Sequence, residues 1–379
     1  MIPVPPAGQP HAPTASGLDD VVVACTALSH IDGARGDLII RGYSIEALAV
    51  RATFEDVCAL LWNGAWPSAG EVDGIRDALT NARLEAFEML PSLGDALSAP
   101  DSMEALRAAI AHLRSGGSLT DRVRMTGAVP VFAAAWARSH AGQPPIPPSP
   151  RLSHVADTLR MLSGVEAAPA FVRALDTYLC CVVDHGMNAS TFTARVVAST
   201  GADSISAVVA ALGALKGPLH GGAPGPVLDM LDAIGDGAHA RRWLENELAA
   251  GRRIMGMGHR IYHVRDPRAA VLERATRVLE TSGLPAPRLP LARAIEREAE
   301  QLLAERHPHR QLRANVEFYT AVLLDALGIP RSLFTPMFAA SRVAGWCAHV
   351  DEQRAVGRLI RPASVYVGPW SSAGVLNSP

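Results

Sequence analysis

Apolar residues recur along most of the chain at intervals of three and four positions, which places them on one face of an α-helix. In the first half this pattern predicts helices over 104–114, 127–139, 152–163, 170–184 and 203–215. In the second half it predicts helices near 225–234, 238–249, 267–281, 288–305, 316–327 and 335–352. Because no segment recurs at a fixed period, a solenoid is excluded.

Polar residues mark several helix starts. Thr53 with Asp56 and Ser68 with Glu71 have the spacing of an N-terminal capping box, and Asp101 with Glu104 imitates it. Ahead of them, the turn residues 31–33 (Ile-Asp-Gly) precede the strand-like run 38–40 (Leu-Ile-Ile), which predicts one short hairpin. The expected fold class is therefore all-α with a minor N-terminal β-hairpin.

Composition agrees with a large helical protein. Hydrophobic residues make up 49% of the 379 residues, whereas aromatic residues, which favour strands, make up only 5%. A chain of this length exceeds the usual size of one hydrophobic core, so we expect two domains.

The distribution of charge and cysteine excludes several classes of protein. The net charge is −2 and the basic residues are dispersed, which argues against a nucleic-acid partner or a membrane surface. No run approaches the roughly 18 apolar residues that span a bilayer, and the proline-rich start lacks the regions of a signal peptide. The five cysteines have no C-x-x-C spacing, which is typical of a reducing compartment. We expect a soluble, cytoplasmic protein.

Residues 216–223 (KGPLHGGA) place a histidine among helix-breaking residues. Gly217 and Pro218 end an apolar helix, and two glycines after His220 let the backbone bend closely around the imidazole. If the next helix begins near Pro224, its N-terminal potential lowers the pKa of His220, and the neutral imidazole can donate a hydrogen bond to an oxyanion or enol. Taken alone, the motif fits a glycine-rich connector equally well.

Residues 256–268 (GMGHRIYHVRDPR) form a second cluster. Two glycines precede His259, and Asp266-Pro267 is a strong helix start with Asp as the N-cap. Arg268 then lies in the first helical turn, where a cation opposes the helix dipole. This unfavourable position beside a glycine-flanked histidine indicates that Arg268 binds an anionic ligand. Surface arginines also occur in first helical turns, however.

Four further positions are weaker signals by themselves. Asn315 is a good N-cap for a helix with Glu317 in its first turn, where the dipole keeps a carboxylate ionised and able to act as a base. Acidic residues favour first turns in any protein, however. His185 fits either a ligand contact or a buried histidine. Arg342 lies in an apolar helix and needs an anionic partner, whereas Arg361 has the pattern of a surface residue.

A metal site is not expected from the histidines. His259 and His263 are four positions apart, but Pro267 indicates that the helix begins only after them. The chain has no H-E-x-x-H motif, and no cysteine pair assists.

In their order along the chain, these motifs resemble the citrate synthase family over nearly the whole sequence. The length and the C-terminal segment RLIRP resemble the shorter, dimeric bacterial form of the family. The segments that carry the resemblance are 17–18 (GL), 41–43 (RGY), 188–192 (NASTF), 217–223 (GPLHGGA), 258–262 (GHRIY), 266–268 (DPR), 315–318 (NVEF), 334–349 (FTPMFAASRVAGWCAH), 358–362 (RLIRP) and 366–369 (YVGP).

The resemblance implies a role for each candidate residue. His220 would stabilise the enol of an acyl-CoA thioester, Glu317 would remove the proton as the base, and His259 would polarise the ketone of oxaloacetate. Oxaloacetate would be held by His185, His259, Arg268, Arg342 and Arg361, the last from the partner subunit of a homodimer. CoA would be bound by Met255, Gly256, Met257, Gly258, His263 and Asn315. No metal and no cofactor are implied, since the acyl-CoA is a substrate.

The family also implies a division of the chain into two helical domains. Residues 1–221 plus 328–379 would form the large domain, and 222–327 a smaller inserted domain that closes over the site. Three positions depart from the family pattern: Glu317 replaces an aspartate, Gly186 stands where glutamate is frequent, and His263 stands where a lysine or arginine meets CoA phosphate.

Two alternatives to citrate synthesis stay open at this stage. The chain may use propionyl-CoA and form 2-methylcitrate, because one methylene is a weak discriminator worth ~1–3 kcal/mol. The second alternative is a non-catalytic relative that binds oxaloacetate or CoA, in which Glu317 in place of aspartate indicates lost activity. The intact His220, His259 and three arginines argue against it.

Overall fold

The computed structural model describes residues 18, 21–116, 120–221 and 224–364. The expected N-terminal arm and the end of the C-terminal tail lie outside these residues. Within them the chain forms fifteen α-helices and one three-stranded sheet, which confirms the all-α fold class with a minor hairpin. None of the described helices is long and apolar enough to cross a membrane.

The sheet is the predicted hairpin extended by one short strand. β1 (Ser29–Asp32) pairs antiparallel with β2 (Asp37–Ile40), which in turn pairs with β3 (Tyr43–Ser44). The turn therefore begins at Gly33, later than expected, because Ile31 and Asp32 still belong to the first strand. Leu38 and Ile40 are fully buried, so this strand anchors the hairpin to the hydrophobic core.

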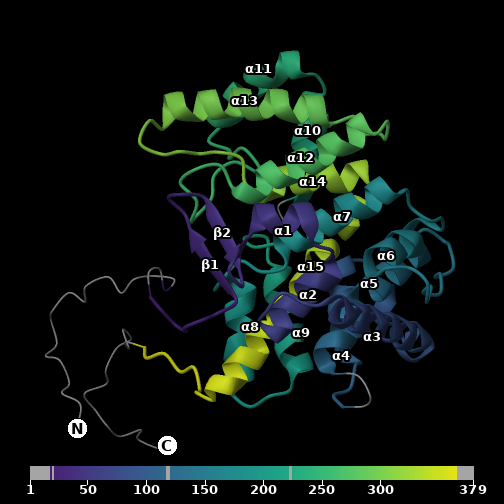
Figure 1. The fold of residues 1–379 in the computed structure, drawn as a ribbon. Coiled ribbons are helices and arrows are strands. Elements are labelled where there is room, and N and C mark those ends of the chain that lie inside the picture. The colour runs from purple at the N-terminus through teal and green to yellow at the C-terminus, as the bar shows by residue number, and fades with distance from the viewer. Residues whose placement is uncertain (1–17, 19–20, 117–119, 222–223, 365–379) are drawn as a thin grey trace, which may run out of the picture.

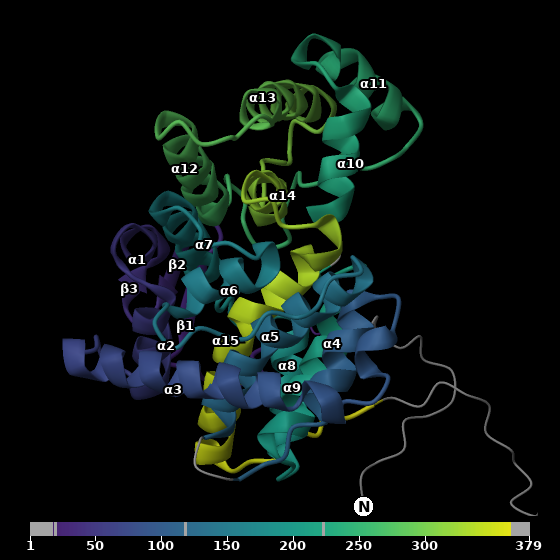
Figure 2. The same ribbon diagram turned by 90° about the vertical axis from the view of Figure 1, so that its right-hand side faces the viewer.

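Most helices form the lower part of the molecule in Figures 1 and 2. They are α1 (Ile45–Arg51), α2 (Phe54–Asn63), α3 (Ala69–Glu88), α4 (Ser102–Ala111), α5 (Asp121–His140), α6 (His154–Ser163), α7 (Pro169–Val182), α8 (Ala189–Ser199), α9 (Ser204–Leu215) and α15 (Phe334–Val356).

The remaining helices, α10 to α14, form the upper part in both views. They are α10 (Pro224–Ile234), α11 (Ala240–Ala249), α12 (Pro267–Thr281), α13 (Leu289–Arg306) and α14 (Val316–Ala326). Short 3₁₀ helices cover Leu90–Ser92, Ala96–Ser98, Gly237–His239 and Arg331–Leu333. One hydrophobic cluster contains residues of both parts, and the division at 222 and 327 remains a prediction.

Both capping boxes with a Ser or Thr N-cap are complete, whereas the similar pair Asp101 and Glu104 is not. Thr53 starts α2 and Ser68 starts α3, each with reciprocal bonds to its acidic partner. Asp101 accepts only the backbone N–H of Glu104, because the Glu104 side chain instead pairs with Lys216 at the end of α9. The ion pair with Lys216 has therefore replaced the hydrogen bond that Glu104 would make to the backbone N–H of Asp101.

Helix α5 begins six residues earlier than its apolar pattern predicts. Arg124, near the start of this helix, is 4% exposed. Its Nε donates to Glu85 Oε1 of α3 at 2.9 Å, so the charge is neutralised inside the packed structure. This contact with α3 stabilises the early start, and the apolar spacing of 127–139 does not reveal the contact.

Candidate functional site

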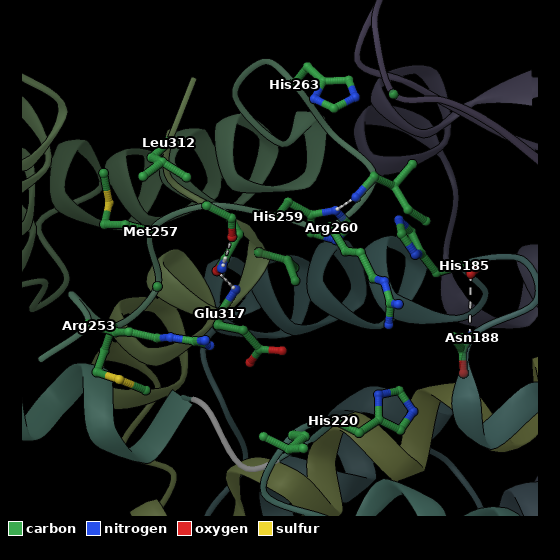
Figure 3. Close-up of a pocket in the computed structure, with 18 of the residues that line it drawn as sticks. His185, Asn188, His220, Arg253, Met257, His259, Arg260, His263, Leu312 and Glu317 are labelled. Atoms are coloured by element: carbon green, nitrogen blue, oxygen red, sulfur yellow. Dashed lines mark hydrogen bonds between the residues drawn. The ribbon is translucent and has the colours of Figure 1, made fainter. Parts of the chain in front are cut away.

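A cleft of about 2110 Å³ lies between the two groups of helices. Its wall is built from the hairpin turn, the start of α8, the turn before α10, the loop 251–263, the ends of α12 and α14, and the middle of α15. In Figure 3 the Glu317 carboxylate points into this space, with His220 on one side and His259 on the other. Segments that are far apart in the sequence therefore meet in one cavity.

Glu317 supplies a carboxylate with a free oxygen. Asn315 is the N-cap of α14, and its Oδ1 accepts the Glu317 backbone N–H at 3.0 Å, as predicted. Oε2 of Glu317 is buried and has no hydrogen-bond partner among the described residues. Burial raises the pKa of Glu317 from 4.5 to about 7, although Arg268 and Arg342 act in the opposite direction. The expectation of a fully ionised, dipole-stabilised carboxylate is therefore wrong, because desolvation outweighs the helix N-terminus.

His220 is held as a neutral hydrogen-bond donor. The Ser190 hydroxyl lies 2.8 Å from its Nε2, and the Ser190 backbone N–H donates to the same nitrogen at 3.4 Å. A backbone N–H can only donate, so Nε2 is the acceptor and Nδ1 carries the proton. Burial, and then the charge of Arg342, lower the pKa of His220 to about 4. This lowered pKa agrees with the predicted neutral state, and burial is its main cause.

His259 is oriented by its own loop. The backbone N–H groups of Ile261 and Tyr262 donate to its Nδ1 at 3.0 and 3.1 Å. The proton is thus on Nε2, the nitrogen that remains for a ligand. Burial, and then Arg268, lower the pKa of this imidazole to about 4. His259 is the second neutral donor of the cleft.

His185 lies beside His259 in the same wall. The two rings meet edge to face with centroids 5.5 Å apart, and His185 Nε2 is 3.1 Å from the Tyr262 hydroxyl. Burial is the main cause of a pKa well below the ordinary value for His185. A buried, neutral imidazole at this place can hydrogen-bond a polar ligand.

Arg268 is paired within the protein. Its Nε and Nη2 donate to the two carboxylate oxygens of Asp266 at 3.0 and 2.8 Å, and both residues are buried. Asp266 also accepts the Val316 backbone N–H at 3.1 Å, which joins the start of α12 to the start of α14. The sequence did not predict this internal pair, and an anionic ligand for Arg268 remains a prediction. The residue still lines the cleft beside Glu317.

Arg342 is the more weakly neutralised cation. Its Nε donates to the Val182 carbonyl at 2.6 Å, and its guanidinium lies over the Phe338 ring at 4.6 Å. Burial lowers its pKa to about 10, so the residue remains charged at neutral pH. No carboxylate forms an ion pair with Arg342 among the described residues. A cation of this kind favours an anionic ligand.

The loop 255–258 forms another part of the wall. Gly256 and Gly258 have φ angles of 73° and 85°, which only glycine adopts readily. Asn315 holds this loop, because its Nδ2 donates to the Gly258 carbonyl at 2.8 Å and its backbone N–H donates to Gly256. Met255, Met257 and the exposed His263 line the cleft too.

Arg361 is the predicted site residue that the structure does not place in the cleft. It is exposed, and it is absent from the residues that line the cavity of its own chain. The backbone N–H of Ile360 donates to Ser199 at the last residue of α8, whereas the cleft is at the first residues of that helix. Eleven residues of helix separate these points by roughly 16 Å.

The sequence analysis missed a group of basic residues on the rim of the cleft. Arg253, Arg306 and Arg310 are exposed lining residues near Leu312. The available signal was the run of basic residues in 306–310 (RHPHR). Among the described residues, no group of three or more His, Cys, Asp or Glu side chains is arranged to hold a metal ion.

The cleft therefore combines a buried carboxylate, two neutral imidazoles and buried cations. A carboxylate with a pKa about 7 can take a proton from carbon, and donors opposite it can stabilise the resulting oxyanion. The fold and site define an acid–base enzyme that acts on a carbonyl compound and holds an anionic partner molecule.

Comparisons with known proteins identify the family. A family model for the C-terminal domain of citrate synthase matches residues 17–363. The chain is 40% identical to a putative citrate synthase 2 from Mycobacterium tuberculosis, covering 93% of this chain and 92% of the relative. It is 36% identical to a 2-methylcitrate synthase from the same species, covering 93% and 90%.

Solved structures agree with these relatives. Citrate synthase from Pyrobaculum aerophilum aligns with a TM-score of 0.84 and 34% identity, covering 98% of this chain and 97% of that one. A ternary complex of citrate synthase from Thermoplasma acidophilum with carboxymethyl coenzyme A and oxaloacetate aligns with a TM-score of 0.85 and 29% identity, covering 96% and 98%. The chain belongs to the citrate synthase family, and it is an acyltransferase of the citrate synthase type.

Proposed function

We propose that the protein condenses acetyl-CoA with oxaloacetate and water to form citrate and CoA. The observation that carries this proposal is the unbonded Oε2 of Glu317 in the same cleft as the Nδ1–H of His220. Glu317 takes a proton from the carbon next to the thioester, and His220 donates a hydrogen bond to the enol oxygen. The enol carbon then attacks the ketone carbon of oxaloacetate, and water hydrolyses the thioester to release CoA.

Oxaloacetate is the anionic partner in this proposal. His259 donates from Nε2 to the ketone, His185 binds beside it, and Arg268 and Arg342 bind the carboxylates. The hydrogen bonds between Arg268 and Asp266 support a guanidinium that is held in one orientation for the substrate. The Thermoplasma relative, which was solved with oxaloacetate, supports this choice of substrate.

CoA occupies the wall formed by Met255, Gly256, Met257 and Gly258, with Asn315 holding that loop. The rim residues Arg253, Arg306 and Arg310 bind its phosphates together with His263. Because three other arginines line the same cleft, phosphate binding need not depend on a lysine or arginine at position 263. No metal and no cofactor take part in this scheme.

The two parts of the molecule must approach one another for the reaction. His259, Arg268 and Glu317 belong to the proposed small domain, 222–327, whereas His185, His220 and Arg342 belong to the large one. The site is complete only between them, so closure would assemble it and exclude water.

We further propose a homodimer in which Arg361 binds oxaloacetate in the partner's site. The place of Arg361 beside the far end of α8 supports this, since its own cleft is beyond reach. The outer faces of α8 and α9, which pack side by side, carry half-buried small or apolar residues such as Val196, Ala210 and Gly213. All five cysteines are free thiols, which supports a cytoplasmic location.

The second candidate function is 2-methylcitrate synthesis from propionyl-CoA, which the 36% identical relative favours. The test is the rate of CoA-thiol release with oxaloacetate, compared between acetyl-CoA and propionyl-CoA. A higher kcat/KM for acetyl-CoA is expected, and a higher value for propionyl-CoA would assign the second function. Tight oxaloacetate binding without release from either thioester would contradict both and favour a non-catalytic sensor.

A further inference from the structure

A chain of buried polar residues runs behind the wall that carries His185. Asp184, its neighbour, accepts a hydrogen bond at 3.1 Å from Nε2 of His349 on α15. His349 Nδ1 lies 2.9 Å from Nη1 of Arg195 on α8. An arginine can only donate, so Nδ1 is the acceptor and the proton of His349 points at Asp184. All three side chains are at most 1% exposed.

The chain continues to the C-terminal segment. Nε of Arg195 donates to Oε1 of Gln353 at 3.0 Å, and Nε2 of Gln353 donates to the Arg358 carbonyl at 3.0 Å. The Ile360 N–H is bound by Ser199 at 3.0 Å. The backbone is thus held at two points immediately before Arg361.

Charge neutralisation does not explain Gln353. Arg195 already has an anionic partner, because its Nη1 donates to Glu352 Oε2 at 2.6 Å. An apolar side chain of similar length would fill the same space without the cost of desolvating polar atoms. The buried amide of Gln353 therefore serves to fix the orientation of the C-terminal backbone relative to the Arg195 guanidinium. Gln353 is 4% exposed, and its amide is used at both ends.

We infer that Gln353, oriented by Arg195, is a positioning residue that aims the C-terminal segment so that Arg361 reaches the oxaloacetate site of a second copy of this chain. This inference rests on the proposed function, in which Arg361 acts across the dimer. Oxaloacetate binding in one subunit then depends on a hydrogen-bonded amide in the other.

The first test is Gln353→Met, which keeps the length and removes both hydrogen bonds. The KM for oxaloacetate should rise about tenfold, the effect of losing roughly 1.4 kcal/mol of binding, while the KM for acyl-CoA stays unchanged. Gln353→Glu keeps the acceptor for Arg195 but loses the donor to Arg358, so it should raise the same KM. Gln301→Met on the exposed face of α13 is the matched control. An unchanged KM for oxaloacetate in both Gln353 variants overturns the inference.

Mixed dimers then locate the effect. The reference pair is Arg361→Ala with His220→Ala: one site keeps its own His220 and receives an intact Arg361, so activity should return once subunit exchange is verified. Gln353→Met mixed with His220→Ala should give a normal KM for oxaloacetate, because the active site then receives its arginine from the chain with native Gln353.

The outcomes separate the two proposals. If the reference pair regains activity but the Gln353→Met pair keeps a raised KM, Gln353 acts on its own site through His349 and Asp184, and the inference alone is overturned. If the reference pair stays inactive despite exchange, the cross-subunit role of Arg361 is wrong, and the inference falls with it.

Discussion

At the scale of single residues, burial decides the protonation states in the cleft. The pKa of Glu317 rises to about 7, while those of His220 and His259 fall to about 4. Near neutral pH the protein therefore holds one partly ionised carboxylate between two neutral imidazoles. The local sequence identified the three residues but not the effect of burial on their pKa values, because desolvation depends on side chains that lie far away in the sequence.

Replacing Glu317 tests its role as the base. Glu317→Gln should lower kcat by roughly 10²–10⁴-fold with little change in oxaloacetate affinity, which we assign to His259 and the arginines. The wild-type kcat/KM should fall as the pH drops below about 7, and the residual activity of the variant should lack this limb. Steady-state kinetics and oxaloacetate titration measure both effects. A near wild-type kcat in Glu317→Gln would mean that another group takes the proton.

The shorter carboxylate is a finer test of geometry. In Glu317→Asp the carboxylate is about one bond short, and a misplacement near 1 Å can cost ~10²-fold in rate. We expect a loss of kcat at pH 8, where both carboxylates are ionised. A gain would show that the backbone suits aspartate better than the residue it carries.

The same residue should lower the stability of the fold. Because the pKa of Glu317 is 4.5 in the unfolded chain and about 7 in the fold, the folded state binds more protons between these values. Its stability should therefore fall as the pH rises from 4.5 to 7 and stay lower above, by at most roughly 3 kcal/mol. Glu317→Gln should raise the melting temperature at pH 8 and change it little at pH 4.5. Equal melting curves at pH 8 would contradict the buried carboxylate.

At the scale of elements, local chemistry predicted most helix starts but not their contacts. The capping boxes at Thr53 and Ser68, and the N-caps Asp266 and Asn315, lie where the sequence indicates. The partner of Arg268 was missed, although Asp266 is only two positions away. A carboxylate that caps a helix and also binds a guanidinium serves two roles, and the pattern reveals only the first.

The hairpin is an unexpected part of the site. The Gly33 carbonyl accepts the His263 N–H at 2.9 Å, and a Cβ at Gly33 would lie 2.1 Å from the Ile261 carbonyl oxygen. Ile261 is one of the two residues whose N–H groups hold His259. The hairpin turn thus packs directly on the loop that orients this imidazole.

Gly33→Ala should displace that loop. We expect a rise of at least tenfold in the KM for oxaloacetate, because His259 loses its fixed direction, while the protein remains folded. The control is Gly74→Ala on the exposed side of α3, where a Cβ meets nothing within 4 Å. Kinetics and melting curves of both variants separate the site effect from general destabilisation. Unchanged kinetics in Gly33→Ala would show that the hairpin turn does not help to orient His259.

At the scale of the whole molecule, the site lies between two groups of helices. Glu317 and His220 are almost one hundred residues apart, and periodicity alone does not reveal that they face one cleft. The order of the motifs, which resembles the citrate synthase family, predicted that meeting. The long-range pairs Arg124–Glu85 and Arg195–His349 had no such guide, because their partners lie on separate helices with no shared motif.

The most direct measurement of the central claim is the stoichiometry of the reaction catalysed by the purified protein. With oxaloacetate and acetyl-CoA, one CoA thiol should be released for each citrate formed, and with propionyl-CoA one for each 2-methylcitrate. Release should require oxaloacetate, and His220→Ala should lower it by at least 10²-fold. Thiol release without oxaloacetate, or release that His220→Ala leaves unchanged, would contradict the account.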